Sequence, residues 1–287
     1  MSLRRRAAVL PCLLLVACGG GSSTNTQTQT QTQSTAIVVF AAASLSRVMP
    51  QEIAAFEKAH PDVSVAGDYE GTQALLTKLE SDATLADVFV SADLAHMTTA
   101  QNRGLVASPR DLAFNTLVIA VPPGNPGHVT GLADLARSGV RLAIADKSVP
   151  AGNYAEQAFA IAESNHDVPA GFARAALANA ATRPTDVETV VNNVAAGVVD
   201  AGIVYATDAR ADTRITALPI AQRDQPVTVY AVAATAHSRH QQAAAEFVAF
   251  LLDAQGQALL HQAGFASPAP TAQPLQNGAP ATPTPTP

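Results

Sequence analysis

Four short segments combine small or hydroxyl-bearing residues with the expected start of a helix, a chemistry suited to holding an anion. They span residues 41–45, 71–75, 149–155 and 185–187. The first N–H groups of a helix lack partners and carry about half a positive charge, so several converging helix starts can bind an anion without Lys or Arg. Ser44 and Thr72 would add hydroxyl donors, and we expect Asp186 to cap its own helix. Each segment alone is explained by ordinary capping; the four together favour a shared anion site.

The hydrophobic pattern predicts that these segments connect strands to helices in an α/β fold. Short apolar runs, typical of buried strands, alternate with stretches whose apolar residues recur at helical spacing. The expected strands are 36–41, 63–66, 88–90, 116–121, 141–145, 201–205 and 227–233. The expected helices are 45–56, 72–79, 93–97, 132–137, 152–163, 187–196 and 241–252. Two successive series suggest two lobes, each a mostly parallel sheet flanked by helices, with ligands bound beyond the carboxyl ends of the strands.

The N-terminus has the order of charge and hydrophobicity found in a secretory signal. Arg4, Arg5 and Arg6 precede an apolar run that is too short to span a bilayer, so we expect residues 1–17 to be removed. The following Leu-Val-Ala-Cys-Gly run resembles the bacterial lipobox, which implies that Cys18 is lipidated and anchors the protein to the extracytoplasmic side of the cell membrane. The alternative is an ordinary signal followed by an unrelated thiol.

Composition separates a folded body from two polar extensions. We expect a flexible Gly/Ser/Thr/Gln tether over the residues that follow the signal and a disordered Pro/Thr/Ala-rich tail at the C-terminus. The expected ranges are 18–35 for the tether, 36–114 with 225–266 for the first lobe, 115–224 for the second lobe, and 267–287 for the tail.

Net charge limits the kinds of partner. Without the three signal arginines the 17 basic side chains fall to 14 against 23 acidic ones, a net charge of −9. This balance argues against a nucleic-acid partner, which normally requires a basic surface. It also means that any attraction for an anion must be local. We further expect a monomer whose body does not span the membrane.

Four motifs together resemble those of the molybdate-binding proteins of ABC transporters. They are the runs 40–45, 86–93, 149–155 and 201–209, in matching order and spacing over residues 37–265. The resemblance implies a periplasmic-binding-protein fold, in which two α/β lobes close over a tetrahedral oxyanion held by hydroxyls and backbone amides. It implies no catalysis, no cofactor and no direct protein–metal ligation. The implied ligand contacts are Ser44, Thr72, Ala151, Val187 and, through its phenol, Tyr205.

The resemblance also implies a function. The protein would capture molybdate, with tungstate as an analogue, and deliver it to an ABC permease and its ATPase. Two residues depart from the family pattern, which usually has serine at Thr72 and a small or neutral residue at Glu70. We expect Glu70 to point outward, because charged side chains avoid unpaired burial. If it pointed into the cleft, its carboxylate would repel a dianion or accept a hydrogen bond from a protonated oxyanion.

Other classes of protein remain as alternatives. An enzyme is disfavoured because Ser44 lacks the G-x-S-x-G context of a hydrolase. His237 and His240 have a spacing that could hold a metal, but no third ligand lies nearby in the sequence, so we interpret them as a solvated surface pair. A receptor for a sulfate- or phosphate-like oxyanion, or a sensor lipoprotein of the same fold, remains open.

Overall fold

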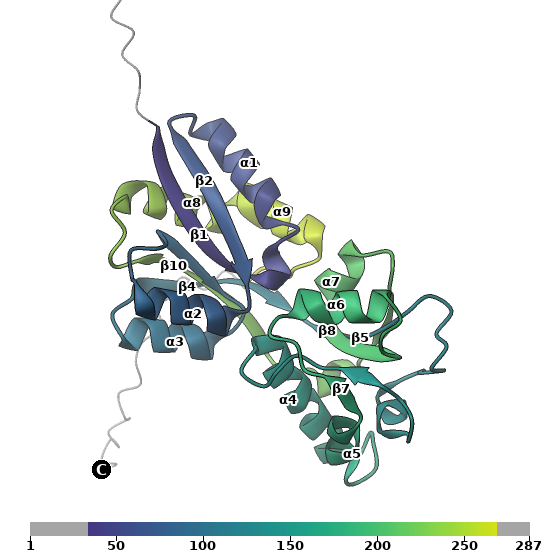
Figure 1. Ribbon diagram of the computed structural model, residues 1–287. Helices are drawn as coiled ribbons and strands as arrows, with labels where there is room; N and C mark the ends of the chain where they lie inside the picture. Colours follow the sequence, from purple (N-terminus) through teal and green to yellow (C-terminus); the bar gives the residue numbers. More distant parts are fainter. Residues whose placement is uncertain (1–33, 269–287) are drawn as a thin grey trace, which may run out of the picture. The chain divides into compact units, whose positions relative to one another are not determined.

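The computed structural model describes residues 34–268 and contains two five-stranded sheets (Figure 1). The predicted signal, the lipidated Cys18 and nearly all of the tether and the tail lie outside the described residues. We call each sheet with its helices a lobe. No helix between residues 34 and 268 is long and apolar enough to cross a membrane.

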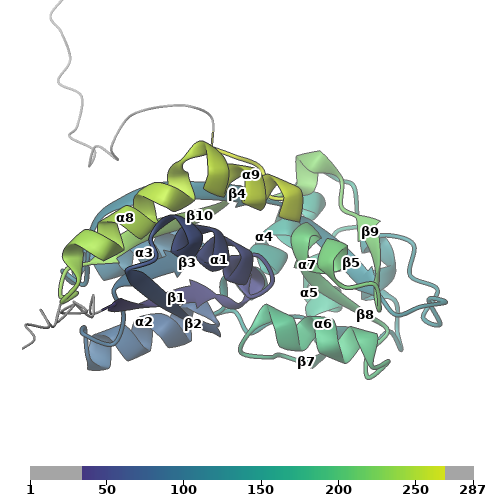
Figure 2. The same ribbon diagram turned by 90° about the horizontal axis from the view of Figure 1, so that it is seen from above.

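The first lobe contains the sheet of order β2-β1-β3-β10-β4. Its strands are β1 (Thr35–Ala42), β2 (Val63–Glu70), β3 (Val88–Ser91), β4 (Val106–Asn115) and β10 (Thr228–Thr235). Its helices are the 3-10 turn η1 (Ala43–Leu45), α1 (Met49–Ala59), α2 (Thr72–Ser81), α3 (Leu94–Asn102), α8 (Gln241–Leu252) and α9 (Ala254–Ala263). α1, α8 and α9 contact one another, as do α2 and α3, and the two groups cover opposite faces of the sheet (Figures 1 and 2).

The second lobe contains the sheet of order β7-β6-β8-β5-β9. Its strands are β5 (Leu117–Val121), β6 (Leu142–Ala143), β7 (Ala180–Thr182), β8 (Ala201–Tyr205) and β9 (Thr216–Pro219). Its helices are η2 (Leu132–Ala136), α4 (Pro150–Ser164), α5 (Phe172–Ala178), α6 (Val187–Ala195), α7 (Ala206–Ala211) and η3 (Gln222–Asp224). The chain passes between the lobes after β4 and returns before β10. The lobe boundaries proposed from the sequence stay a prediction.

The central strands β1 and β3 of the first sheet are covered on both faces, which explains their unbroken apolar runs. In β1, Val39 and Ala41 belong to the main hydrophobic core, whereas Phe40 belongs to a second cluster with residues of α2 and α3. In β3, Val90 and Phe89 divide between the two clusters in the same way. Successive side chains of a strand point to opposite faces, so a strand covered on both sides reads as continuously apolar.

The structure confirms the two-lobed α/β fold and corrects one detail of it. Each sheet is mixed rather than mostly parallel: β10 runs antiparallel to β3 and β4, and β5 runs antiparallel to β8 and β9. Six further elements have no counterpart among the predicted ones: β4, β7, β9, α5, α7 and α9. β4 lacks the apolar run of a buried strand because it lies at the sheet edge and contains Pro109, Arg110 and Asp111. It pairs with β10 through register shifts.

Glu52 on α1 is a buried carboxyl. It is fully buried on a helix that packs against α8 and α9, and neither of its oxygens has a hydrogen-bond partner between residues 34 and 268. Burial, with a smaller contribution from the Asp253 carboxylate, raises the pKa of Glu52 from 4.5 to about 8.

We expect this carboxyl to make the folded state less stable as pH rises. Between pH 4.5 and about 8 the folded state retains a proton that the unfolded state has lost, so the free energy of unfolding falls across this window. Glu52→Met fills similar space without the charge. Thermal melts should show Tm of the native protein falling more steeply than that of the variant between pH 5 and 8. The Tm values of the native protein and the variant at pH 5 provide the control. Equal slopes of Tm against pH in the two proteins would contradict the prediction.

Candidate functional site

One small cavity is lined by residues from both lobes. Its lining residues are Ala42, Ala43, Ser44, Gly71, Thr72, Ala92, Val149, Pro150, Ala151, Val187 and Tyr205. They include all five residues that the sequence predicts as ligand contacts, and none of the eleven carries a charge. The cavity volume is about 10 Å³, close to the smallest that holds one water molecule. A tetrahedral oxyanion is larger than water, so admitting one requires the walls to move apart.

The strand pairing of the first lobe places two of these residues together. β1 and β2 are parallel neighbours, and their last residues, Ala42 and Glu70, are directly paired. Ser44 in η1 and Thr72 at the start of α2 follow these strand ends. Parallel strands end at one edge of a sheet, and this edge is the usual ligand-binding edge of an α/β sheet.

The second lobe contributes two helix starts and a tyrosine. Ala151 is the second residue of α4, Val187 is the first residue of α6, and Tyr205 ends β8. Backbone N–H groups in the first turn of a helix have no acceptor within that helix, so Ala151 and Val187 present donors. Asp186 caps α6, as predicted, because its carboxylate accepts a 2.7 Å hydrogen bond from the N–H of Thr189.

Gly152 allows α4 to begin close to the preceding loop. A Cβ atom at this position would lie 2.2 Å from the carbonyl oxygens of both Ala145 and Asp146, which is shorter than any van der Waals contact. The residue must therefore be glycine for the start of α4 to reach the cavity.

Three hydroxyl-bearing side chains line the cavity. Thr72 Oγ1 accepts a 3.1 Å hydrogen bond from the N–H of Ala92, which leaves its own proton free. Ser44 Oγ lies 2.7 Å from the phenol oxygen of Tyr230. The Tyr205 hydroxyl is buried and has no hydrogen-bond partner among the described residues. Burial raises the pKa of Tyr205 well above its ordinary value, so this phenol keeps its proton and remains a donor.

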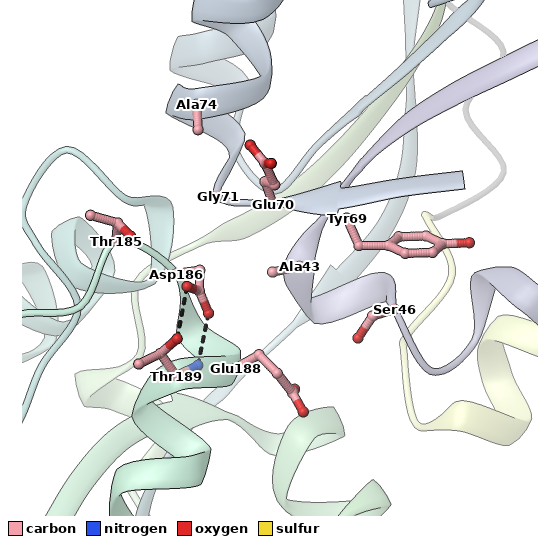
Figure 3. A pocket seen from close by; sticks show the side chains of 10 residues that line it. All are labelled: Ala43, Ser46, Tyr69, Glu70, Gly71, Ala74, Thr185, Asp186, Glu188 and Thr189. Atoms are coloured by element: carbon pink, nitrogen blue, oxygen red, sulfur yellow. Dashed lines mark hydrogen bonds between the residues drawn. The ribbon is translucent and has the colours of Figure 1, made fainter. Parts of the chain in front are cut away.

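A larger pocket adjoins the cavity and contains Glu70. This pocket has a volume of about 490 Å³ and shares Ala43 and Gly71 with the small cavity (Figure 3). The Glu70 carboxylate points toward α2 and lies 2.7 Å from the Lys78 ammonium group. Glu70 therefore points away from the small cavity, as expected, and its charge is paired.

Contacts between the lobes surround the cavity. The Gln73 side-chain amide donates a 2.7 Å hydrogen bond to the carbonyl oxygen of Thr185. Arg47 lies 2.7 Å from Glu188 and 3.2 Å from Asp212. These contacts link α2 and the segment between η1 and α1 in the first lobe to the second lobe, and they must break when the lobes separate.

The histidine pair singled out in the sequence does not form a metal site. His240 Nδ1 lies 3.3 Å from Asp87 and its side chain is 41% exposed. Between residues 34 and 268 no group of three or more His, Cys, Asp and Glu side chains is placed to hold a metal. Tyr230, which contacts Ser44, is not among the site residues predicted from the sequence. Its one signal there is a phenol hydroxyl between the apolar residues Val229 and Ala231 of β10.

Comparison with known proteins agrees with this geometry. Residues 37–266 match the family described as bacterial extracellular solute-binding proteins. The chain is 36% identical over 256 residues to the molybdate-binding protein ModA of Mycobacterium bovis, covering 88% of this chain and 93% of that protein. The periplasmic molybdate-binding protein of Azotobacter vinelandii has a similar structure, with a TM-score of 0.67, 18% identity and coverage of 81% and 100%. The sulfate-binding protein SubI of Mycobacterium tuberculosis also has a similar structure, with a TM-score of 0.70 and 22% identity. The match covers 82% of this chain and 88% of that protein.

The chain therefore belongs to the bacterial extracellular solute-binding protein family. Within that family the chain is similar to the ModA proteins, as the sequence motifs indicated. It is a binding protein rather than an enzyme, and it acts outside the cytoplasm. The two solved structures, both under 25% identical to this chain, show the shared fold.

Proposed function

We propose that the protein captures molybdate, and tungstate as its analogue, and delivers it to an ABC permease driven by an ATPase. The observation that carries this proposal is the small cavity, where both lobes contribute hydroxyls or helix-start N–H groups and no charged side chain. Such a site offers donors to a dianion. The 36% identity to a protein named for molybdate binding supports the choice of anion.

Donors alone also give selectivity. Phosphate carries a proton near neutral pH and needs an acceptor in its site, which hydroxyls and N–H groups facing the ligand as donors do not supply. Sulfate has the same charge and shape as molybdate but is smaller, so discrimination between them depends on the size of the closed cavity. The methyl group of Thr72, which lines this cavity, bears on that size. A sulfate receptor is therefore the second candidate.

Calorimetric titration with molybdate, tungstate, sulfate and phosphate tests the proposal. We expect dissociation constants in the micromolar range or below for molybdate and tungstate, and no heat of binding for sulfate or phosphate. Tight sulfate binding without molybdate binding would select the second candidate. Binding of none of the four anions would overturn both.

We also propose that Cys18 is lipidated and anchors the protein to the membrane, with no cofactor and a monomeric body. This part rests on the sequence around Cys18. In cells given radiolabelled palmitate, the native chain should be labelled and remain with the membrane fraction. Cys18→Ser should abolish the label and release the protein. Sedimentation of the purified protein would test the monomer.

Replacing Gly71 should hinder closure of the lobes. A Cβ atom on Gly71 would lie 2.4 Å from the carbonyl oxygen of Thr185 in the other lobe, although the φ of −57° and ψ of 136° suit alanine. Gly71→Ala should therefore weaken molybdate binding by about 1–3 kcal/mol, the usual range for overpacking, and leave the thermal stability of the ligand-free protein nearly unchanged. Calorimetry and thermal melts measure the two effects.

Gly131→Ala is the matched control, because a Cβ atom there meets nothing within 4 Å. It should bind molybdate like the native protein. Unchanged affinity in Gly71→Ala would show that the lobes do not need this approach in order to hold the ligand.

A further inference from the structure

The hydroxyl of Ser44 is shared between the candidate site and a buried tyrosine on β10. Ser44 Oγ and the Tyr230 phenol oxygen are 2.7 Å apart, and the Tyr230 side chain is fully buried. The Tyr230 ring packs edge-on against Tyr205 and Phe265, with centroid separations of 5.7 and 5.3 Å. Tyr230 does not line the cavity, so it can influence a ligand only through a neighbour.

The shared hydrogen bond has two arrangements. If Ser44 donates to Tyr230, the Ser44 proton points away from the cavity and the serine oxygen presents lone pairs to the ligand. If Tyr230 donates to Ser44, the Ser44 proton is free to point into the cavity. An oxyanion is compatible with the second arrangement only, because two oxygen lone pairs facing each other repel.

The Tyr230 phenol can remain the donor in its hydrogen bond to Ser44. Burial raises the pKa of Tyr230 far above its ordinary value, and the nearby Asp208 carboxylate acts in the same sense, so the phenol stays protonated over the range in which the protein works. The Tyr205 and Asn115 side chains also adjoin this phenol, and Ser44 Oγ lies at hydrogen-bond distance, 2.7 Å from it.

We propose that Tyr230 is a positioning residue for oxyanion binding: its O–H donates to Ser44 and thereby fixes Ser44 as a donor toward the ligand. This inference rests on the proposed function. It has a consequence for selectivity, since a serine held as a donor disfavours a ligand oxygen that carries a proton. Without the phenol, Ser44 could turn its lone pair toward such a ligand.

Calorimetric titration of the Tyr230→Phe variant with molybdate and with inorganic phosphate at neutral pH tests the proposal. Phenylalanine keeps the ring packing and removes only the hydroxyl. We expect molybdate affinity to fall about 3- to 10-fold, the effect of one ordinary hydrogen bond, and the preference for molybdate over phosphate to narrow. Tyr154→Phe, at another buried tyrosine outside the cavity lining, should leave that preference unchanged.

A double-mutant cycle with Ser44→Ala separates positioning from packing. If Tyr230 acts through Ser44, Tyr230→Phe should have no further effect on molybdate affinity once Ser44 is alanine. An equal loss in both backgrounds, or no loss in either, would overturn the inference while leaving molybdate binding by the native protein intact. Failure of the native protein to bind molybdate would overturn the proposed function and this inference with it.

Discussion

Val187→Pro should weaken molybdate binding by about 1.5–3 kcal/mol, a loss of roughly 10- to 100-fold, because it removes a backbone N–H that we propose donates to the anion. Val187 is the first residue of α6, where proline is well accommodated. The preceding Asp186 is extended, with φ of −155° and ψ of 160°, as a residue before proline prefers. The cap from Asp186 to the N–H of Thr189 is untouched. The helix should therefore still form.

Val187→Ala is the matched control for this substitution. The side chain is buried, and both variants lose apolar contacts, but only proline lacks the N–H group. Calorimetry should show near-native molybdate affinity for the alanine variant and a large loss for the proline variant. Equal affinities in the two variants would remove the Val187 amide from the ligand site.

Tyr205→Phe should change stability and binding in opposite directions. The Tyr205 side chain is 1% exposed and its hydroxyl has no hydrogen-bond partner in the described part of the chain, so the ligand-free protein carries the cost of an unsatisfied buried group, about 1–3 kcal/mol. Removing the hydroxyl should raise the free energy of unfolding by up to that amount. Since this hydroxyl is proposed to donate to a charged ligand, the same change should weaken molybdate binding by about 1.5–3 kcal/mol.

Urea denaturation without ligand and calorimetry with molybdate measure these two effects. The edge-on packing of the ring against Tyr230 is retained in phenylalanine, so a general loss of packing is not expected. A fall in both stability and affinity would indicate that the hydroxyl has a structural partner instead. Unchanged affinity would show that Tyr205 lines the cavity without contacting the ligand.

These expectations explain how a protein with a net charge of −9 after signal removal could hold a dianion. The attraction does not come from a basic surface. In the proposed site it comes from helix starts and hydroxyls gathered in a small cavity, where a hydrogen bond to the anion is stronger than it would be in solvent. The Lys78 ammonium group pairs with Glu70 and keeps that carboxylate directed away from the cavity.

The sequence by itself determined the local features of the site. Ser44 and Thr72 follow apolar runs, Asp186 precedes a helical pattern, and these are signals carried by a few neighbouring residues. The four motifs in order also indicated which residues would share one site. The matching family and the two-sheet fold confirm that reading of the architecture, while the ligand contacts stay a prediction.

Only the tertiary structure decided which groups from distant parts of the chain meet. Tyr230 lies 186 residues beyond Ser44, and the Gly71 region touches Thr185 across the lobes. The direction of the Glu70 carboxylate depended on Lys78, and the mixed order of the first sheet depended on the return of β10 from the second lobe. Hydrophobic periodicity specifies which face of an element is buried, but it carries no information about the partner that buries it, and closure, orientation and pairing all depend on that partner.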